Sequence, residues 1–112
     1  MRVFQLKGAA KSSEAGEYIL GLEELHTHAV YLIYGVLHPG EKGRKVHPGR
    51  GHEEILCIAK GKLRANSGHE TFSMEEGEAI HLHEEDVFYL ENDADEVSHY
   101  VLAGGHIMEH HH

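Results

Sequence analysis

Turn-forming residues divide the chain into short segments, and they recur roughly every 8–12 positions between residues 30 and 105. The segments between the turns are rich in β-branched and aromatic residues, as in the run Val30–Leu37 before the turn pair Pro39-Gly40. Several segments alternate polar and apolar residues, which is the pattern of a strand with one buried face. This spacing predicts an all-β sandwich or barrel rather than a fold of alternating strands and helices.

The same alternation gives the expected positions of the strands. They cover residues 17–20, 30–37, 54–59, 62–65, 70–74, 79–83, 86–90 and 97–102. Residues 12–25 could instead form a helix, but Gly16 and Gly21 would each cost about 1 kcal/mol relative to alanine. We therefore expect a short strand over 17–20 between loops, and we expect the last strand to end before Gly104.

Length and cysteine content indicate one domain without a disulfide framework. The chain has 112 residues, a length typical of a single domain. Cys57 is its only cysteine and cannot form an internal disulfide. The histidine run 110–112 resembles the remains of a purification tag and is excluded from fold reasoning. We expect one domain over residues 1–107 and a tag-like tail over 108–112.

The charge of the chain excludes two classes of partner. Its formal net charge of −9 disfavours binding to nucleic acid or to an anionic membrane surface, because phosphate groups repel it. No apolar run approaches the roughly 20 residues of a membrane span, and the first residues lack the apolar centre of a signal peptide. We expect a soluble, cytoplasmic protein whose partners are a small-molecule ligand and a second copy of itself.

Histidine is unusually frequent, with 13 residues in the chain and ten of them outside the tail. Imidazole is a common ligand of transition metals, and it also titrates near neutral pH. The excess therefore raises the question of whether the fold gathers some of these side chains into a metal site.

Around the third expected strand, histidine, glutamate and glycine are regularly spaced. Glu54 lies seven residues before Gly61, and His47 lies seven residues before Glu54. This spacing resembles the first motif of the cupins, a family of small double-sheet jelly-roll proteins. The motif has a second histidine where this chain has Gly49, and His52 is the nearby residue that could replace it.

A later stretch, residues 77–92, resembles the second cupin motif. The opening glycine and closing asparagine of the motif match Gly77 and Asn92, whereas Phe88 stands at the position of the metal-binding histidine. The resemblance extends over roughly residues 30–102 and implies a double-stranded β-helix, the jelly-roll barrel of the cupins. The metal positions of the motifs are only partly kept.

The residues around the first motif favour a metal site that includes Glu54. Positions 52 and 54 have the same parity, so the side chains of His52 and Glu54 point to one face of an extended strand. His47 comes from the segment before the loop and could meet them if that face lines the barrel. A second alignment takes His47 as the later histidine of the motif and leaves Lys45 at the earlier position.

Two further histidines could complete the site. His83 shares a strand face with His81 and lies close to the position of the missing histidine. His99 shares its face with Val97 and Val101, so it either points inward or lies at a dimer interface. The candidate metal ligands are His47, His52, Glu54, His83 and His99. The cupin resemblance implies that the metal is a divalent transition ion: Fe, Mn, Ni or Zn.

Three hypotheses of function follow. The first is a protein that binds a divalent metal, a small molecule or both in the barrel; as an enzyme it would be a metal-dependent oxygenase or isomerase. The sequence assigns no catalytic residue and leaves enzymatic activity open. The alternative is a non-catalytic binding or sensing module with a degenerate metal site, marked by Phe88. The third is a homodimer that pairs through an edge strand over residues 3–6, because an unpaired edge favours association.

Overall fold

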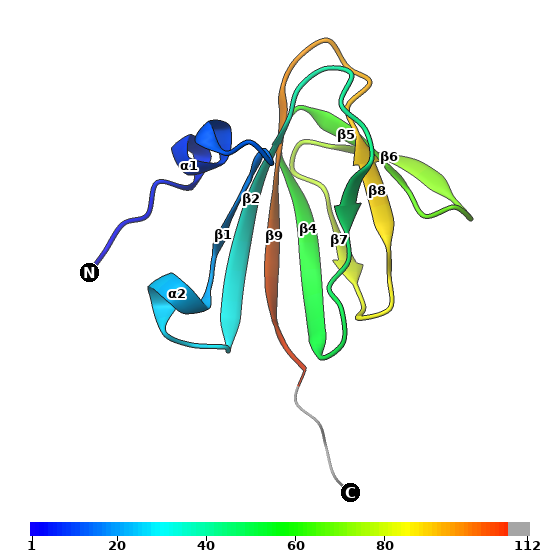
Figure 1. The fold of residues 1–112 in the computed structure, drawn as a ribbon. Coiled ribbons are helices and arrows are strands. Elements are labelled where there is room, and N and C mark those ends of the chain that lie inside the picture. The colour runs from blue at the N-terminus through cyan, green and yellow to red at the C-terminus, as the bar shows by residue number, and fades with distance from the viewer. Residues whose placement is uncertain (108–112) are drawn as a thin grey trace, which may run out of the picture.

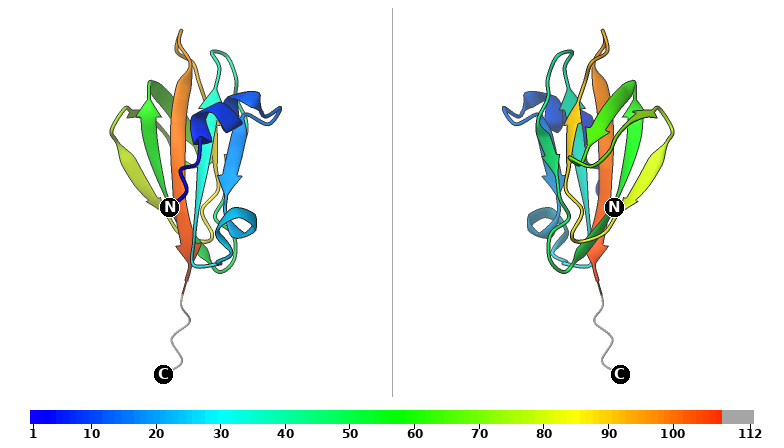
Figure 2. Two further views of the ribbon diagram at one scale, coloured as in Figure 1. Left: turned by 90° about the vertical axis from the view of Figure 1, so that its left-hand side faces the viewer. Right: turned by 90° about the vertical axis from the view of Figure 1, so that its right-hand side faces the viewer.

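Two antiparallel sheets face each other in the structure, a computed structural model that describes residues 1–107 (Figure 2). The tag-like tail expected over residues 108–112 lies outside the described residues. The five-stranded sheet has the order β1-β2-β9-β4-β7 and the four-stranded sheet the order β3-β8-β5-β6 (Figure 1). The elements are α1 (Leu6–Ser12), β1 (Glu17–Leu20), α2 (Leu22–Leu25), β2 (Val30–Leu37), β3 (Arg44–Val46), β4 (His52–Lys60), β5 (Lys62–Asn66), β6 (Thr71–Glu75), β7 (Ala79–Leu82), β8 (Phe88–Glu91) and β9 (Ser98–His106).

The all-β prediction is confirmed, and every strand expected between residues 17 and 102 overlaps an observed one. The end of the last strand was predicted wrongly, because β9 continues through Gly104 to His106. At this point β9 lies between β2 and β4, and pairing on both sides holds the glycine in an extended strand. A glycine inside a strand often marks the close approach of another group, which is the case here.

The N-terminal segment differs from the edge strand expected over residues 3–6. Leu6 begins helix α1, whose Ala9 and Ala10 favour a helix, and Ala10 is fully buried against the sheet. The helix packs against β1 and β2 (Figure 1). Residues 3–6 therefore form no strand in the structure, and the homodimer stays a prediction. Within residues 1–107, no helix has the length and apolar character that crossing a membrane requires.

The core lies between the two sheets and follows the alternation of the strands. In β4, Leu56 and Ile58 are 0% and 1% exposed, whereas Ile55 between them is 50% exposed on the outer face. The buried apolar residues of this core are Leu37, Val46, Leu56, Ile58, Leu63, Ala65, Met74, Leu82, Phe88, Leu90, Tyr100 and Leu102. The inner face of the five-stranded sheet carries polar groups towards both ends, and one of these ends holds the candidate site.

Candidate functional site

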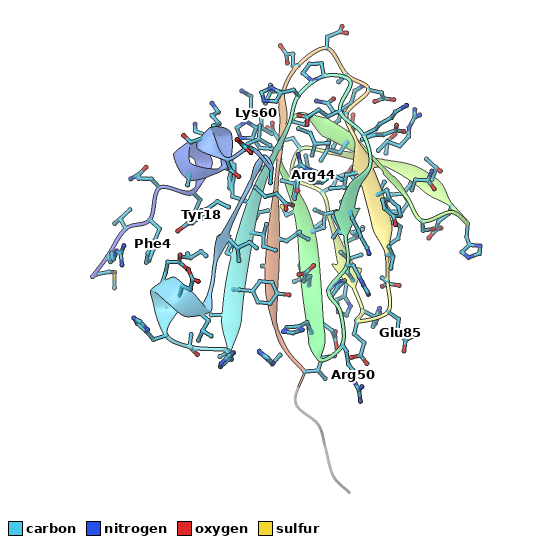
Figure 3. The ribbon with its side chains drawn as sticks, viewed as in Figure 1. Phe4, Tyr18, Arg44, Arg50, Lys60 and Glu85 are labelled. Carbon is cyan, nitrogen blue, oxygen red and sulfur yellow. The ribbon has the colours of Figure 1, made fainter. Side chains whose placement is uncertain are left out.

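A buried carboxyl group lies near the end of the barrel where β4 begins. This strand starts at His52, just after Arg50, and ends at Lys60 at the opposite end (Figure 3). Its alternation points Glu54 inward together with Leu56, and Glu54 is only 5% exposed. A carboxyl group removed from water needs hydrogen-bond partners. The groups around Glu54 therefore decide what this end of the barrel can bind.

Tyr31 supplies one partner from a strand that does not touch β4. Its hydroxyl donates to Glu54 Oε2 over 2.5 Å. Gly104 of β9 lies between them, paired with Tyr31 on one side and with Glu54 on the other. A Cβ at position 104 would lie 2.3 Å from Tyr31 Cζ, so the tyrosine ring requires a glycine beneath it.

The hydroxyl of Tyr31 is the donor of the hydrogen bond to Glu54. Burial raises the pKa of Tyr31, and the hydrogen bond to Glu54 and the negative charge of Glu54 raise it further. The proton therefore stays on the tyrosine, and Glu54 Oε2 acts as the acceptor. This bond fixes one of the two carboxylate oxygens.

The other oxygen, Glu54 Oε1, is buried and has no hydrogen-bond partner among residues 1–107. An unpaired buried acceptor costs about 1–3 kcal/mol. A molecule that donated a hydrogen bond to Oε1 would remove this cost. Glu54 Oε1 is therefore an acceptor that the rest of the fold leaves available.

A pocket of 190 Å³ opens beside Tyr31 at the same end of the barrel, and we call it the mouth pocket. Part of its wall is a row of rings: the centroid of His52 is 5.8 Å from that of Tyr31 and 4.5 Å from that of His106. The row continues to His28, whose centroid is 5.6 Å from that of His106. Aliphatic side chains on the wall come from Ile19, Leu22 and Val30. The pocket thus combines rings and aliphatic surface, and Glu54, two residues along β4 from His52, lies behind the Tyr31 side of the wall and outside the lining.

The structure does not bring the five candidate metal ligands together. His47 is exposed after β3, and His83 is exposed after β7. His99 points to the outer face of β9, because its neighbour Ser98 and the following tyrosine point inward. His52 and Glu54 do share the inner face, as their parity predicted. Within residues 1–107 no three His, Cys, Asp or Glu side chains are placed to hold a metal ion, so the donors present do not fit the metal centre that the resemblance implies.

His99 is a buried packing group on the outer face. It is 2% exposed, and its Nδ1 lies 2.6 Å from the hydroxyl of Tyr34. Burial lowers the pKa of His99, and the positive charge of Lys60 and of the α1 lysines lowers it further. The imidazole is thus held neutral near α1, with the sheet between it and Glu54.

Phe88 belongs to the core between the two sheets. The side chain is 8% exposed, and its ring centroid lies 5.6 Å from that of Phe72 in an edge-to-face contact. An aromatic hydrocarbon therefore stands at the position where the second cupin motif has its metal-binding histidine.

A larger hollow of 740 Å³ lies near the opposite end of β4, between β5 and the loop before β9. Its acidic lining residues are Glu75, Glu76, Asp93, Asp95 and Glu96. Among residues 1–107, none of the buried polar atoms without a partner lies in this hollow. Water can hydrate such a cluster of exposed carboxylates, so the hollow needs no ligand. The mouth pocket is therefore the stronger candidate site.

Sequence reasoning found Glu54 and His52 but missed Tyr31, Gly104 and His106. The available signal was the Gly104-Gly105 pair, because a glycine within a strand can mark the close approach of a side chain. Interpreting the pair as a turn removed Gly104 from the strand and His106 from the site.

Comparisons with known proteins identify the fold. A scan against models of protein families found no match, and a search of curated proteins found none either. An uncharacterized conserved protein with a double-stranded β-helix domain from Klebsiella pneumoniae is similar in structure, with a TM-score of 0.73 and 16% identity over 94% of this chain and 90% of that chain. A cupin protein from Bacteroides fragilis matches with a TM-score of 0.71 and 14% identity over 89% of this chain and 86% of that chain.

A predicted oxalate decarboxylase from Thermotoga maritima matches with a TM-score of 0.67 and 16% identity, covering 81% of each chain. Identities this low show a shared fold and do not transfer an activity. The two facing sheets, the strand order and these likenesses over most of the chain agree. The chain therefore has the cupin fold, the double-stranded β-helix that its two sequence motifs resemble.

Proposed function

We propose that this chain is a non-catalytic module that binds a small molecule in the mouth pocket. The observation that carries the proposal is the pocket wall itself, formed by the rings of Tyr31, His52 and His106, with the Tyr31 hydroxyl held by the buried Glu54 behind it. The pocket volume of 190 Å³ equals the space of about six water molecules at about 30 Å³ each. It therefore suits a small ligand.

The chemistry of the pocket argues against the substrate class of one structural neighbour. Oxalate is a small dianion, and its binding would call for positive charge. None of the described residues that line the mouth pocket is lysine or arginine, so the pocket itself offers a dianion only imidazoles.

A divalent transition metal in the barrel is the second candidate. The observation in its favour is that His52 and Glu54 share the inner face of β4 and that His106 of β9 pairs with His52. Tyr31 holds only Oε2 of Glu54, but within residues 1–107 no three donors are gathered around the other oxygen, so we rank the metal below the metal-free proposal.

The two candidates separate in one set of measurements on the chain without its three terminal histidines. We expect metal analysis to find no stoichiometric Fe, Mn, Ni or Zn, and the melting temperature to be unchanged by a chelator. We also expect a library of small fragments to shift the backbone NMR signals of Tyr31, His52 and Gly104. One metal ion per chain that disappears in Glu54→Gln would establish the metal candidate instead, and fragments that shift only signals far from the mouth pocket would overturn the proposed site.

A further inference from the structure

We infer that the outer face of the five-stranded sheet binds a second copy of this chain. The strands of the two copies run antiparallel, so the end of the face where β4 begins meets the end where β4 stops in the other copy. This inference concerns a protein interface and does not depend on the mouth pocket. Three observations carry it: an exposed apolar surface, charges of opposite sign at its two ends, and its area.

The middle of the outer face is apolar and exposed to solvent. Strand alternation turns outward the side chains that lie between the core residues. Val30 of β2 and Ile55 of β4 are 58% and 50% exposed, and Ala79 of β7 and Ala103 of β9 are exposed beside them. The half-buried residues of this surface are Leu32, Cys57 and Val101. A contiguous exposed apolar surface of this kind is typical of an interaction site.

Strand β4 carries opposite charges at the two ends of this surface. Glu53 lies near the start of the strand, and Lys60 ends it on the side nearer to α1 (Figure 3). Lys60 pairs with the outward-pointing His99, and within residues 1–107 it forms no ion pair. Glu53 binds His81 through Oε1 alone. The face therefore has an acidic group at one end and a basic group at the other.

The two short helices repeat this polarity at the β1 edge of the sheet. Helix α1 carries the exposed Lys7 and Lys11, and helix α2 lies at the other end of β1 (Figure 1) and carries Glu23 and Glu24. Glu24 lies beside the outer face, because it accepts a hydrogen bond from the outward-pointing Tyr18. The basic helix is at the end of Lys60, and the acidic helix is at the end of Glu53.

An antiparallel arrangement of two copies matches these charges. A two-fold axis that crosses the strands between the two faces lays each strand over its own copy in the reverse direction. Lys60 then faces Glu53 of the second copy, and α1 faces α2. Arg2 lies near Glu24 and offsets part of the acidic charge of α2. Each contact occurs twice in such a dimer, and complementary charges fix the relative orientation of the partners.

The area of the face is that of a stable interface. The sheet has five strands, and the longest of them have nine residues. At strand spacings of about 4.8 Å and about 3.3 Å per residue, the face measures roughly 24 by 30 Å. This is roughly 700 Å², close to the about 800 Å² that each partner buries in an interface of standard size. Helix α1 covers one corner of the face and presents its own exposed side to the second copy.

The first test is the mass of the chain without its terminal histidines, measured by light scattering and sedimentation equilibrium. We expect twice the mass of one chain at micromolar concentrations. A monomer throughout the micromolar range overturns the inference.

Two charge reversals test the orientation of the copies. Lys60→Glu places glutamates opposite each other at both ends of β4, and Glu53→Lys places lysines there. Each should raise the Kd of the dimer at least about tenfold, because the altered contact occurs twice. The control Lys45→Glu makes the same change of charge on an exposed side chain of β3 in the other sheet, and it should change the Kd by less than about twofold.

Mixing the two reversals restores the match. In a heterodimer of Lys60→Glu with Glu53→Lys, opposite charges face each other at both ends of β4. An equimolar mixture should therefore recover the affinity of the parent chain. Reversals that leave the Kd unchanged, or folded variants whose mixture does not recover it, overturn the antiparallel arrangement.

Cys57 supplies a measurement that needs no variant. It points outward near the middle of β4, between Glu53 and Lys60, so the two Cys57 side chains of the dimer should lie close to the two-fold axis. Facing sheets are about 10 Å apart, so a short bis-maleimide should join the two thiols. Cys57 is the only cysteine of the chain, so a linked product identifies this contact. A chain that is dimeric in solution and gives no linked product overturns the proposed face.

Discussion

Gly35 of β2 lies directly beneath the ring of Tyr100 in the neighbouring strand β9. A Cβ at position 35 would lie 2.0 Å from Tyr100 Cζ, a distance that non-bonded carbons do not reach. Tyr100 is 0% exposed, and its hydroxyl donates to Glu17 while accepting from Arg44. The substitution Gly35→Ala would therefore force a fully buried ring away from two charged partners.

Two costs add in this variant. Overpacking a well-filled core costs about 1–3 kcal/mol, and a hydrogen bond to a charged group contributes about 1.5–3 kcal/mol. Water can replace part of the hydrogen bonding, because Glu17 and Arg44 are only half-buried. We expect Gly35→Ala to lower the free energy of unfolding by about 3–5 kcal/mol, among the largest effects of single substitutions. The melting temperature should fall by about 12–20 °C at about 4 °C per kcal/mol.

Gly104→Ala provides a matched comparison, because a Cβ there would lie 2.3 Å from Tyr31 Cζ. Tyr31 is only half-buried and borders the mouth pocket, so its ring can move into open space. We expect a loss of about 1–2 kcal/mol. Gly8→Ala is the control: its Cβ would meet no atom within 4 Å, and alanine in helix α1 should stabilise the protein by about 0.5–1 kcal/mol.

Unfolding in guanidinium chloride followed by far-ultraviolet circular dichroism measures all three variants. A loss in Gly35→Ala no larger than in Gly104→Ala would refute the reasoning, since the full burial of the Tyr100 ring and its two charged partners are the differences invoked. The combination Gly35→Ala/Tyr100→Leu offers a second check. If the ring causes the penalty, the glycine substitution should cost less than about 1 kcal/mol in the Tyr100→Leu background.

Three further outcomes are expected. The lowered pKa of His99 means that, in mildly acidic solution, the unfolded chain binds a proton at His99 which the folded chain does not. The free energy of unfolding should therefore fall as the pH drops below about 6.5. His99 contributes at most about 1.4 kcal/mol per pH unit to this fall. Denaturant unfolding of His99→Gln should show a shallower dependence in the same window, and an unchanged one would assign the effect to other groups. Phe88→His should lower the free energy of unfolding by about 2–4 kcal/mol, because it places a polar ring in the core. Calorimetric titration of this variant with Co²⁺, in the chain without its terminal histidines, should detect no binding, because the other expected ligands stay apart. A homodimer that pairs through the outer face of β4, where Ile55 is 50% exposed, predicts that Ile55→Lys halves the mass measured by light scattering. A monomeric parent chain contradicts the homodimer on any face.

The strand pattern was predictable because two local signals agree along most of the chain. Turn residues mark where strands stop, and alternation marks which face is buried. The spacing from Glu54 to Gly61 likewise placed a buried carboxyl group on the correct strand and face. These features depend only on neighbours in the sequence.

Other elements were decided by packing. The strand β3 has only three residues, too few to show an alternation, and it forms by pairing with β8. Helix α1 also lacks a strong local signal, since Gly8 is one of its seven residues, and contacts with β1 and β2 complete it. In both cases tertiary contacts outweigh a weak local preference.

The partners of Glu54 illustrate why its role could not be predicted. Period-two alternation shows that Glu54 points inward, but the register of three strands decides which side chain it meets. Tyr31 is 23 residues away in sequence and reaches Glu54 only because Gly104 stands opposite both of them. A shift of β2 by one residue would turn Tyr31 to the outer face and leave both oxygens of Glu54 without this donor. Which oxygen of this glutamate is bound and which is left unpaired thus depends on a pairing that no spacing along the chain records.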